Sequence, residues 1–174
     1  MATLLIDQLM FFQPVRIPVY IRSKIQECAI NHLELRDMGQ LRDRMEGQLY
    51  YNRLSDDIMA EYAFEKYIRL GDFDWHLRMN KNYKRKFYDF EFKNLNLIIL
   101  DGETYPRFDL KRIKSCVFIY LYSESKAWIS GLATQKLMEE FGVLNDNGIT
   151  EIQQFENFLP FSNREELQLL LNRL

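Results

Sequence analysis

The chain has 174 residues, of which 47% are hydrophobic, and this is enough for one domain with a core of its own. Its 23 basic and 25 acidic residues leave a net charge of −2, so any contact with nucleic acid would need local basic clusters. Two cysteines support neither a disulfide framework nor a zinc site. No signal peptide and no apolar segment long enough to span a bilayer is recognisable, so we expect a cytoplasmic protein without membrane contact.

The first third of the chain predicts helices. Between residue 19 and about residue 35, apolar residues recur at helical spacing, at Ile21, Ile25, Cys28, Ala29 and Leu33. His32 lies near the end of this segment, where a cation suits the helix dipole, so we expect a structural role for it rather than a ligand role. Residues 40–52 are compatible with a second helix or with a long connection. We treat residues 1–54 as an N-terminal helical extension.

A further helix is predicted from residue 55 to the neighbourhood of Gly71. Ser55 can cap its start, and two aspartates follow in the first turn. Its apolar stripe is formed by Ile58, Met59, Tyr62 and Ala63. Glu61 and Glu65 stand one turn apart beside this stripe, and Glu61 is the better candidate to point inward.

Residues 71–79 and 87–93 alternate polar and apolar side chains with a period of two, which is typical of strands. If the two segments pair as a hairpin, their charged rows lie side by side. These rows contain Asp72, Asp74, Asp89, Glu91 and Lys93. Carboxylates so close repel one another unless a cation compensates, and oxygen ligands favour Mg²⁺ or Mn²⁺. The alternative interpretation is an ordinary solvated strand face.

The second half of the chain predicts strands and two helices. Residues 117–122 and 127–131 indicate buried strands joined by a polar turn. Thr134 can cap a helix that continues through residue 141. A last helix is expected after Ser162 or Asn163, with leucines that could close the core or meet a second subunit in a homodimer.

The tripeptide Glu91-Phe92-Lys93 has the form acid, any residue, lysine. The same form occurs at Asp109/Lys111 and Glu124/Lys126, so it is uninformative without its context. The Glu91 copy alone lies in an aromatic strand pattern that follows a helix with a glutamate and a segment with acids. This order resembles the PD-(D/E)XK nuclease superfamily over residues 55–141.

The resemblance implies an α/β (α+β) fold with a restriction-endonuclease-like core in a single domain. A mixed central β-sheet flanked by helices is expected, and residues 95–100, 115–122 and 127–134 would supply the rest of this sheet. Extra N-terminal helices would precede the core, and residues 142–174 would form a C-terminal tail and helix.

The resemblance further implies a metal-dependent nuclease that hydrolyses DNA. Asp74 and Glu91 would bind Mg²⁺ or Mn²⁺ together with a carbonyl such as that of Phe92, and Glu61 would be an outer ligand or hold a second ion. Lys93 would position the attacking water or stabilise the developing charge. Asp72 could replace Asp74, and Asp89 could replace Glu91.

A basic cluster lies between the two alternating segments, at Lys81, Lys84, Arg85 and Lys86. These side chains could hold the DNA backbone beside the metal, or they could be solvated loop residues. The leading alternative to a nuclease is a catalytically inactive module of the same fold that binds nucleic acid or protein. An unrelated interaction protein with acids as surface charge is a third possibility.

Overall fold

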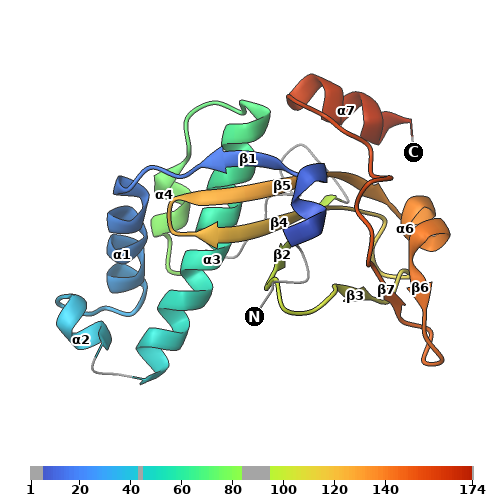
Figure 1. Cartoon of the computed structure of the whole chain (residues 1–174). Helices are drawn as coiled ribbons and strands as arrows, with labels where there is room; N and C mark the ends of the chain where they lie inside the picture. Colours follow the sequence, from blue (N-terminus) through green and yellow to red (C-terminus); the bar gives the residue numbers. More distant parts are fainter. Residues whose placement is uncertain (1–5, 43–44, 84–94, 174) are drawn as a thin grey trace.

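The computed structural model describes residues 6–42, 45–83 and 95–173 (Figure 1). In chain order the elements are η1 (Ile6–Phe11), β1 (Gln13–Arg16), α1 (Tyr20–His32), α2 (Met38–Arg42), α3 (Met45–Ile68), α4 (Trp75–Met79), β2 (Leu95–Leu100), β3 (Arg107–Phe108), β4 (Ser115–Ser123), β5 (Lys126–Thr134), α6 (Gln135–Phe141), β6 (Val143–Leu144), β7 (Thr150–Glu151) and α7 (Arg164–Asn172). No helix within these described ranges combines the length and apolar composition needed to cross a bilayer.

A mixed four-stranded sheet with the order β1-β5-β4-β2 forms the centre of the molecule (Figure 1). β2 and β4 are parallel, whereas β4 with β5 and β5 with β1 are antiparallel. A small antiparallel sheet, β3-β7-β6, lies to one side. The expectation of an α/β fold with a mixed sheet flanked by helices is therefore confirmed.

Both faces of the central sheet are buried. β4 directs Val117 and Ile119 toward a core that includes residues of α1 and α3, and it directs Cys116 and Phe118 toward a second core. The second core is closed by Phe12, Leu110, Met138, Ile152, Phe155 and Phe158. An apolar residue at nearly every strand position follows from this two-sided burial, and it explains why these strands were recognisable in the sequence.

The N-terminal and C-terminal segments both contribute to the core structure. β1 joins the central sheet, and α3 runs without a break across the expected boundary at residue 54. Asn163 caps α7 by accepting a hydrogen bond from the Glu166 amide. Leu167 is fully buried in the core, so α7 closes the core, which is one of the two roles considered for its leucines.

A bulge in β5 lets the C-terminal segment join the sheet. Val117 pairs with Leu132, but Ile119 pairs with Ile129, so β5 has one extra residue between these pairs. The Phe118 amide donates to Ser130 Oγ at 2.9 Å. Beyond the end of β1, Leu132 exchanges two backbone hydrogen bonds with Leu159. The tail therefore covers the part of the β5 edge that β1 leaves open.

The prediction of a strand at residues 71–79 is wrong, because α4 occupies this segment. The Asp74 carboxylate accepts a hydrogen bond from the Leu77 amide at 3.0 Å and so caps the helix. The second half of the expected hairpin, residues 87–93, lies outside the described residues. The start of α3 also differs from expectation, because the helix begins at Met45 rather than at Ser55.

Candidate functional site

Only part of the predicted catalytic set can be placed. Glu61 lies in the middle of α3 with 1% of its surface exposed, as expected for an inward-pointing acid. Asp74 is exposed at the start of α4. The remaining predicted site residues, Glu91, Phe92, Lys93, Lys84, Arg85 and Lys86, lie outside the described residues, as does Asp89.

Glu61 is bound by a buried arginine that the sequence patterns did not single out. Arg78 of α4 donates from Nε and Nη2 to Glu61 Oε2, at 3.0 and 2.8 Å. The same Nη2 donates to Glu65 Oε1 at 2.5 Å, and Nη1 donates to the Asp74 carbonyl at 3.1 Å. We refer to Glu61, Glu65 and Arg78 as the buried triad.

The buried triad has two carboxylates for one guanidinium. Burial raises the pKa of Glu65, although Arg78 opposes this effect. Burial alone would lower the pKa of Arg78, but the carboxylates of Glu61 and Glu65 raise it above its ordinary value. Arg78 is therefore charged, and Glu65 retains a proton to higher pH than an exposed glutamate does.

The acids that can be placed do not fit a Mg²⁺ or Mn²⁺ site. Glu61 and Glu65 share the Arg78 guanidinium, and the Asp74 carboxylate binds the α4 backbone. Among the described residues, no group of three or more His, Cys, Asp or Glu side chains is arranged to hold a metal ion. The repulsion between Glu61 and Glu65 is reduced by Arg78, which contacts both carboxylates.

Two side chains of α1 hold the end of α4 that carries Arg78. His32 Nε2 lies 2.8 Å from the Arg78 carbonyl oxygen, and Asn31 donates to the Met79 carbonyl at 2.6 Å. Because a carbonyl only accepts, His32 Nε2 is the protonated nitrogen, and Nδ1 accepts from the Tyr50 hydroxyl at 2.7 Å. His32 thus has a structural role. Its side chain binds the C-terminal end of α4, whereas the sequence analysis expected it to act on the end of α1.

Acidification is expected to weaken the fold through His32. Burial lowers the pKa of His32 below 6.5, so the unfolded chain takes up a proton at a higher pH than the folded chain does. The stabilisation by His32 is complete above about pH 6.5 and decreases as the pH falls toward the folded pKa. We expect the stability advantage of wild type over His32→Gln to shrink between about pH 7.5 and about pH 5.5 in urea unfolding. An advantage that is the same at both values would contradict this.

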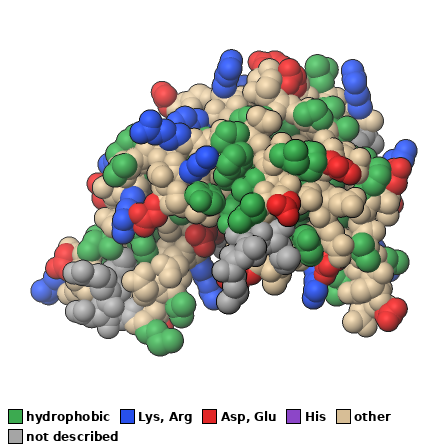
Figure 2. Space-filling view, viewed as in Figure 1, with side chains coloured by type: hydrophobic (Ala, Val, Ile, Leu, Met, Phe, Trp, Pro, Cys, Tyr) green, Lys and Arg blue, Asp and Glu red, His purple; other side chains and the backbone are tan. Residues whose placement is uncertain are grey.

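A pocket of about 410 Å³ adjoins the buried triad at the C-terminal end of α3. Its walls include the aromatic residues Tyr20, Tyr62, Phe73 and Trp75 and the basic residues Lys66 and Arg69. Glu65 of the triad also lines it, and Phe73 stacks on Arg78 with 4.0 Å between the guanidinium carbon and the ring centroid. We call this the aromatic pocket. Figure 2 shows Lys and Arg side chains gathered over the neighbouring surface of α1, β1 and the end of α3.

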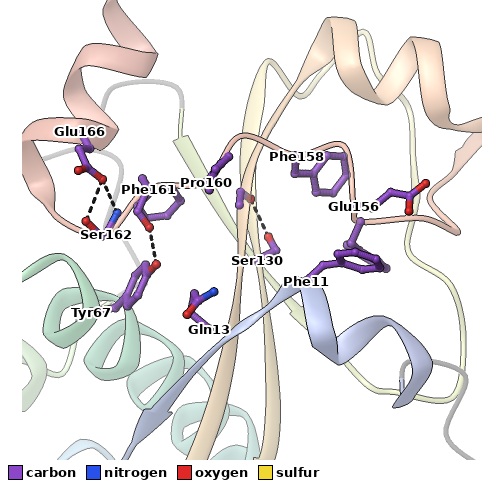
Figure 3. A pocket seen from close by; sticks show the side chains of 12 residues that line it. Phe11, Gln13, Tyr67, Ser130, Glu156, Phe158, Pro160, Phe161, Ser162 and Glu166 are labelled. Atoms are coloured by element: carbon purple, nitrogen blue, oxygen red, sulfur yellow. Dashed lines mark hydrogen bonds between the residues drawn. The ribbon is translucent and has the colours of Figure 1, made fainter.

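A second pocket, of about 520 Å³, lies between β5 and residues 155–162, and we call it the tail pocket (Figure 3). Its Tyr67 hydroxyl holds the tail, whereas the hydroxyls of Ser130 and Ser162 bond within their own segments. Ser130 Oγ donates to the Gly131 carbonyl, Tyr67 donates to the Phe161 carbonyl, and Ser162 donates to Glu166. The acids that line the pocket are Glu156 and Glu166, and Glu166 accepts hydrogen bonds from the Ser162 amide and hydroxyl.

Lys81, one of the predicted DNA contacts, forms an exposed ion pair with Glu34. An exposed pair of this kind is weak, so Lys81 can exchange this partner for a phosphate at little cost.

The sequence did contain a signal for Arg78, which stands four residues after Asp74, a spacing that places the two on one face of a helix.

Comparison with protein-family models, with curated proteins and with solved structures finds no match to this chain. The resemblance to the PD-(D/E)XK superfamily therefore depends on the order of a few residues.

Proposed function

We propose that this chain is a nucleic-acid-binding domain that contacts single-stranded DNA at the aromatic pocket. The observation that carries this proposal is the combination of four aromatic side chains with Lys66 and Arg69 around one pocket. Aromatic rings stack on bases of any sequence, and lysine and arginine bind the phosphates between them. Local basic residues of this kind are what a chain with a net charge of −2 needs for such contacts.

The buried triad favours binding over catalysis through Glu61. Arg78 contacts both acids of α3 and the backbone of Asp74, and its side chain is only 3% exposed. Removing Arg78 would take the shared cation away from two buried carboxylates, which is strongly unfavourable. In this arrangement Glu61 is a structural residue.

A metal-dependent nuclease that hydrolyses DNA is the second candidate. It is favoured by the position of Glu61, in the middle of a helix that packs on a mixed sheet, and by the start of β2 at Leu95, just after Lys93 in the sequence. Its metal-binding and catalytic residues would be centred on Glu91 and Lys93. A homodimer stays a prediction for either candidate.

The two candidates are separated by measuring binding and cleavage on the same protein. We expect a fluorescein-labelled single strand to bind in EDTA, with an affinity that falls steeply as salt is added. Supercoiled plasmid should stay intact with Mg²⁺ or Mn²⁺. Cleavage that requires either metal and is lost in Lys93→Ala would establish the nuclease instead. Absence of both binding and cleavage would refute both candidates and leave a protein partner.

A further inference from the structure

We propose that the aromatic pocket takes up one unstacked base of a DNA strand and that Glu65 selects guanine. This inference rests on the proposed function and assigns a base to its binding site. In this arrangement the aromatic rings stack on the base, Glu65 accepts hydrogen bonds from its Watson–Crick edge, and Lys66 and Arg69 contact the flanking phosphates.

The rings of the pocket form an angular wall. Tyr62 and Phe73 meet with centroids 5.3 Å apart and planes at 70°, and Phe73 and Trp75 meet at 4.9 Å and 69°. The fourth ring, Tyr20, belongs to α1 and is 55% exposed. A volume of about 410 Å³ is within the range of small-molecule pockets and can admit a base. Aromatic walls around a single base are how proteins hold bases taken out of a stack.

Glu65 supplies the polar recognition group. Its side chain is 9% exposed and lines the pocket, and its Oε1 is bound by Arg78. Within the part of the chain that the structure describes, no hydrogen bond reaches Oε2. A carboxylate can only accept, so it suits a base with adjacent N–H donors. Guanine has two such donors, N1–H and the N2 amino group, whereas thymine has one N–H between two carbonyl oxygens.

Lys66 and Arg69 place two positive charges at the rim. Lys66 is exposed, its Nζ donates to the Arg16 carbonyl at 3.0 Å, and it lies 5.7 Å from the centroid of the Tyr62 ring. Arg69 is exposed as well. Asp72 is a negative charge on the same rim, so the two cations there face one rim carboxylate and the Glu65 carboxylate of the buried triad.

The backbone conformation of Arg69 allows its side chain to be removed without loss of stability. Arg69 has a φ of 57°, in the left-handed region that favours glycine, where α3 ends. Glycine at this position is therefore expected to relieve backbone strain. Glu34 has a φ of 53° where α1 ends and does not line the aromatic pocket, so it provides a matched control.

The first test measures base preference. Four labelled strands of about ten nucleotides are titrated with the protein, and binding is measured by fluorescence anisotropy. They are oligothymidine and its variants with one central dG, dA or dC. We expect the dG strand to bind most tightly and Glu65→Gln to lose this preference. If Glu65 has only a structural role, Glu65→Gln keeps the same order of affinity for the four bases as wild type. Equal affinity of wild type for all four strands would overturn the assignment of guanine.

The second test separates binding from stability. Arg69→Gly should raise the melting temperature by about 1–4 °C, because it relieves backbone strain, and should still weaken strand binding several-fold. Glu34→Gly should raise the melting temperature similarly without weakening binding. Trp75→Ala should weaken binding by about tenfold, whereas Tyr122→Ala, which removes an exposed aromatic ring from β4, should not.

The outcomes distinguish this inference from the proposed function. If wild type binds no strand at all, the proposed function fails. If wild type binds but Arg69→Gly and Trp75→Ala bind equally well, the strand lies elsewhere, for example along Lys81, and the pocket assignment alone is overturned. Because Arg69→Gly is expected to stabilise the protein, misfolding would not explain a loss of binding.

Discussion

Replacing Arg78 with methionine is expected to lower the free energy of unfolding at neutral pH by about 3–5 kcal/mol. Methionine fills a similar volume but removes the cation that contacts both Glu61 and Glu65. The pKa of Glu65 in the folded state should then rise further, because Arg78 no longer lowers it. The loss should therefore be largest at neutral pH and should diminish as the pH falls and the carboxylates take up protons. Urea unfolding over this range measures both effects.

The control for Arg78→Met is a variant that replaces Glu61, Glu65 and Arg78 together by apolar residues. In the triple variant with Glu61→Leu and Glu65→Met, all three charges of the buried triad are removed, and we expect much of the lost stability to return. Glu65→Gln alone should be nearly neutral, because it keeps an acceptor for Arg78 and leaves one carboxylate for one guanidinium. If Arg78→Met costs less than about 1 kcal/mol and shows no dependence on pH, Arg78 does not compensate buried charges in solution.

Gly131→Ala is expected to detach the tail from β5 and to destabilise the fold by at least about 3 kcal/mol. An added Cβ would lie 2.8 Å from the Leu159 carbonyl oxygen and 2.9 Å from the Phe158 carbonyl group. Both are backbone atoms, so the clash cannot be relieved by a side-chain rotation. Phe155, Phe158 and Phe161 are at most 5% exposed and would lose burial with the tail.

Limited proteolysis with chymotrypsin measures the detachment of the tail. We expect rapid cleavage of Gly131→Ala within residues 155–161 under conditions in which wild type stays intact. Gly39→Ala is the control, because its Cβ would meet only the movable side chain of Asp37. Equal resistance of wild type and Gly131→Ala would show that the tail does not need the close approach at Gly131.

The sheet was predictable because its strands are buried on both faces. The run at residues 95–100 coincides with β2, and the expected strands at residues 117–122 and 127–131 fall within β4 and β5. The cap at Thr134 was also correct, since its side chain accepts from the Leu137 amide. Each of these features depends on the residues of one segment, and a local pattern can reveal it.

The site was less predictable because it depends on contacts between distant segments. Polar and apolar side chains alternate over residues 71–79, and this pattern wrongly predicted a strand. The cap formed by Asp74 and the burial of Arg78 against α3 favour a helix there instead. The inward position of Glu61 was correct, but its partner Arg78 stands 17 residues later in the chain. The expected place of Glu91 and Lys93 beside Glu61 stays a prediction, since both lie outside the described residues.

The pairing of Leu132 with Leu159 has a consequence for folding during synthesis of the chain. On the ribosome β5 is made before residues 155–161, so the half of its edge beyond β1 has no partner at that moment. An open strand edge next to an uncovered Phe118 is a surface on which neighbouring nascent chains can associate. Chaperone dependence during translation should therefore end only when the segment around Leu159 has emerged.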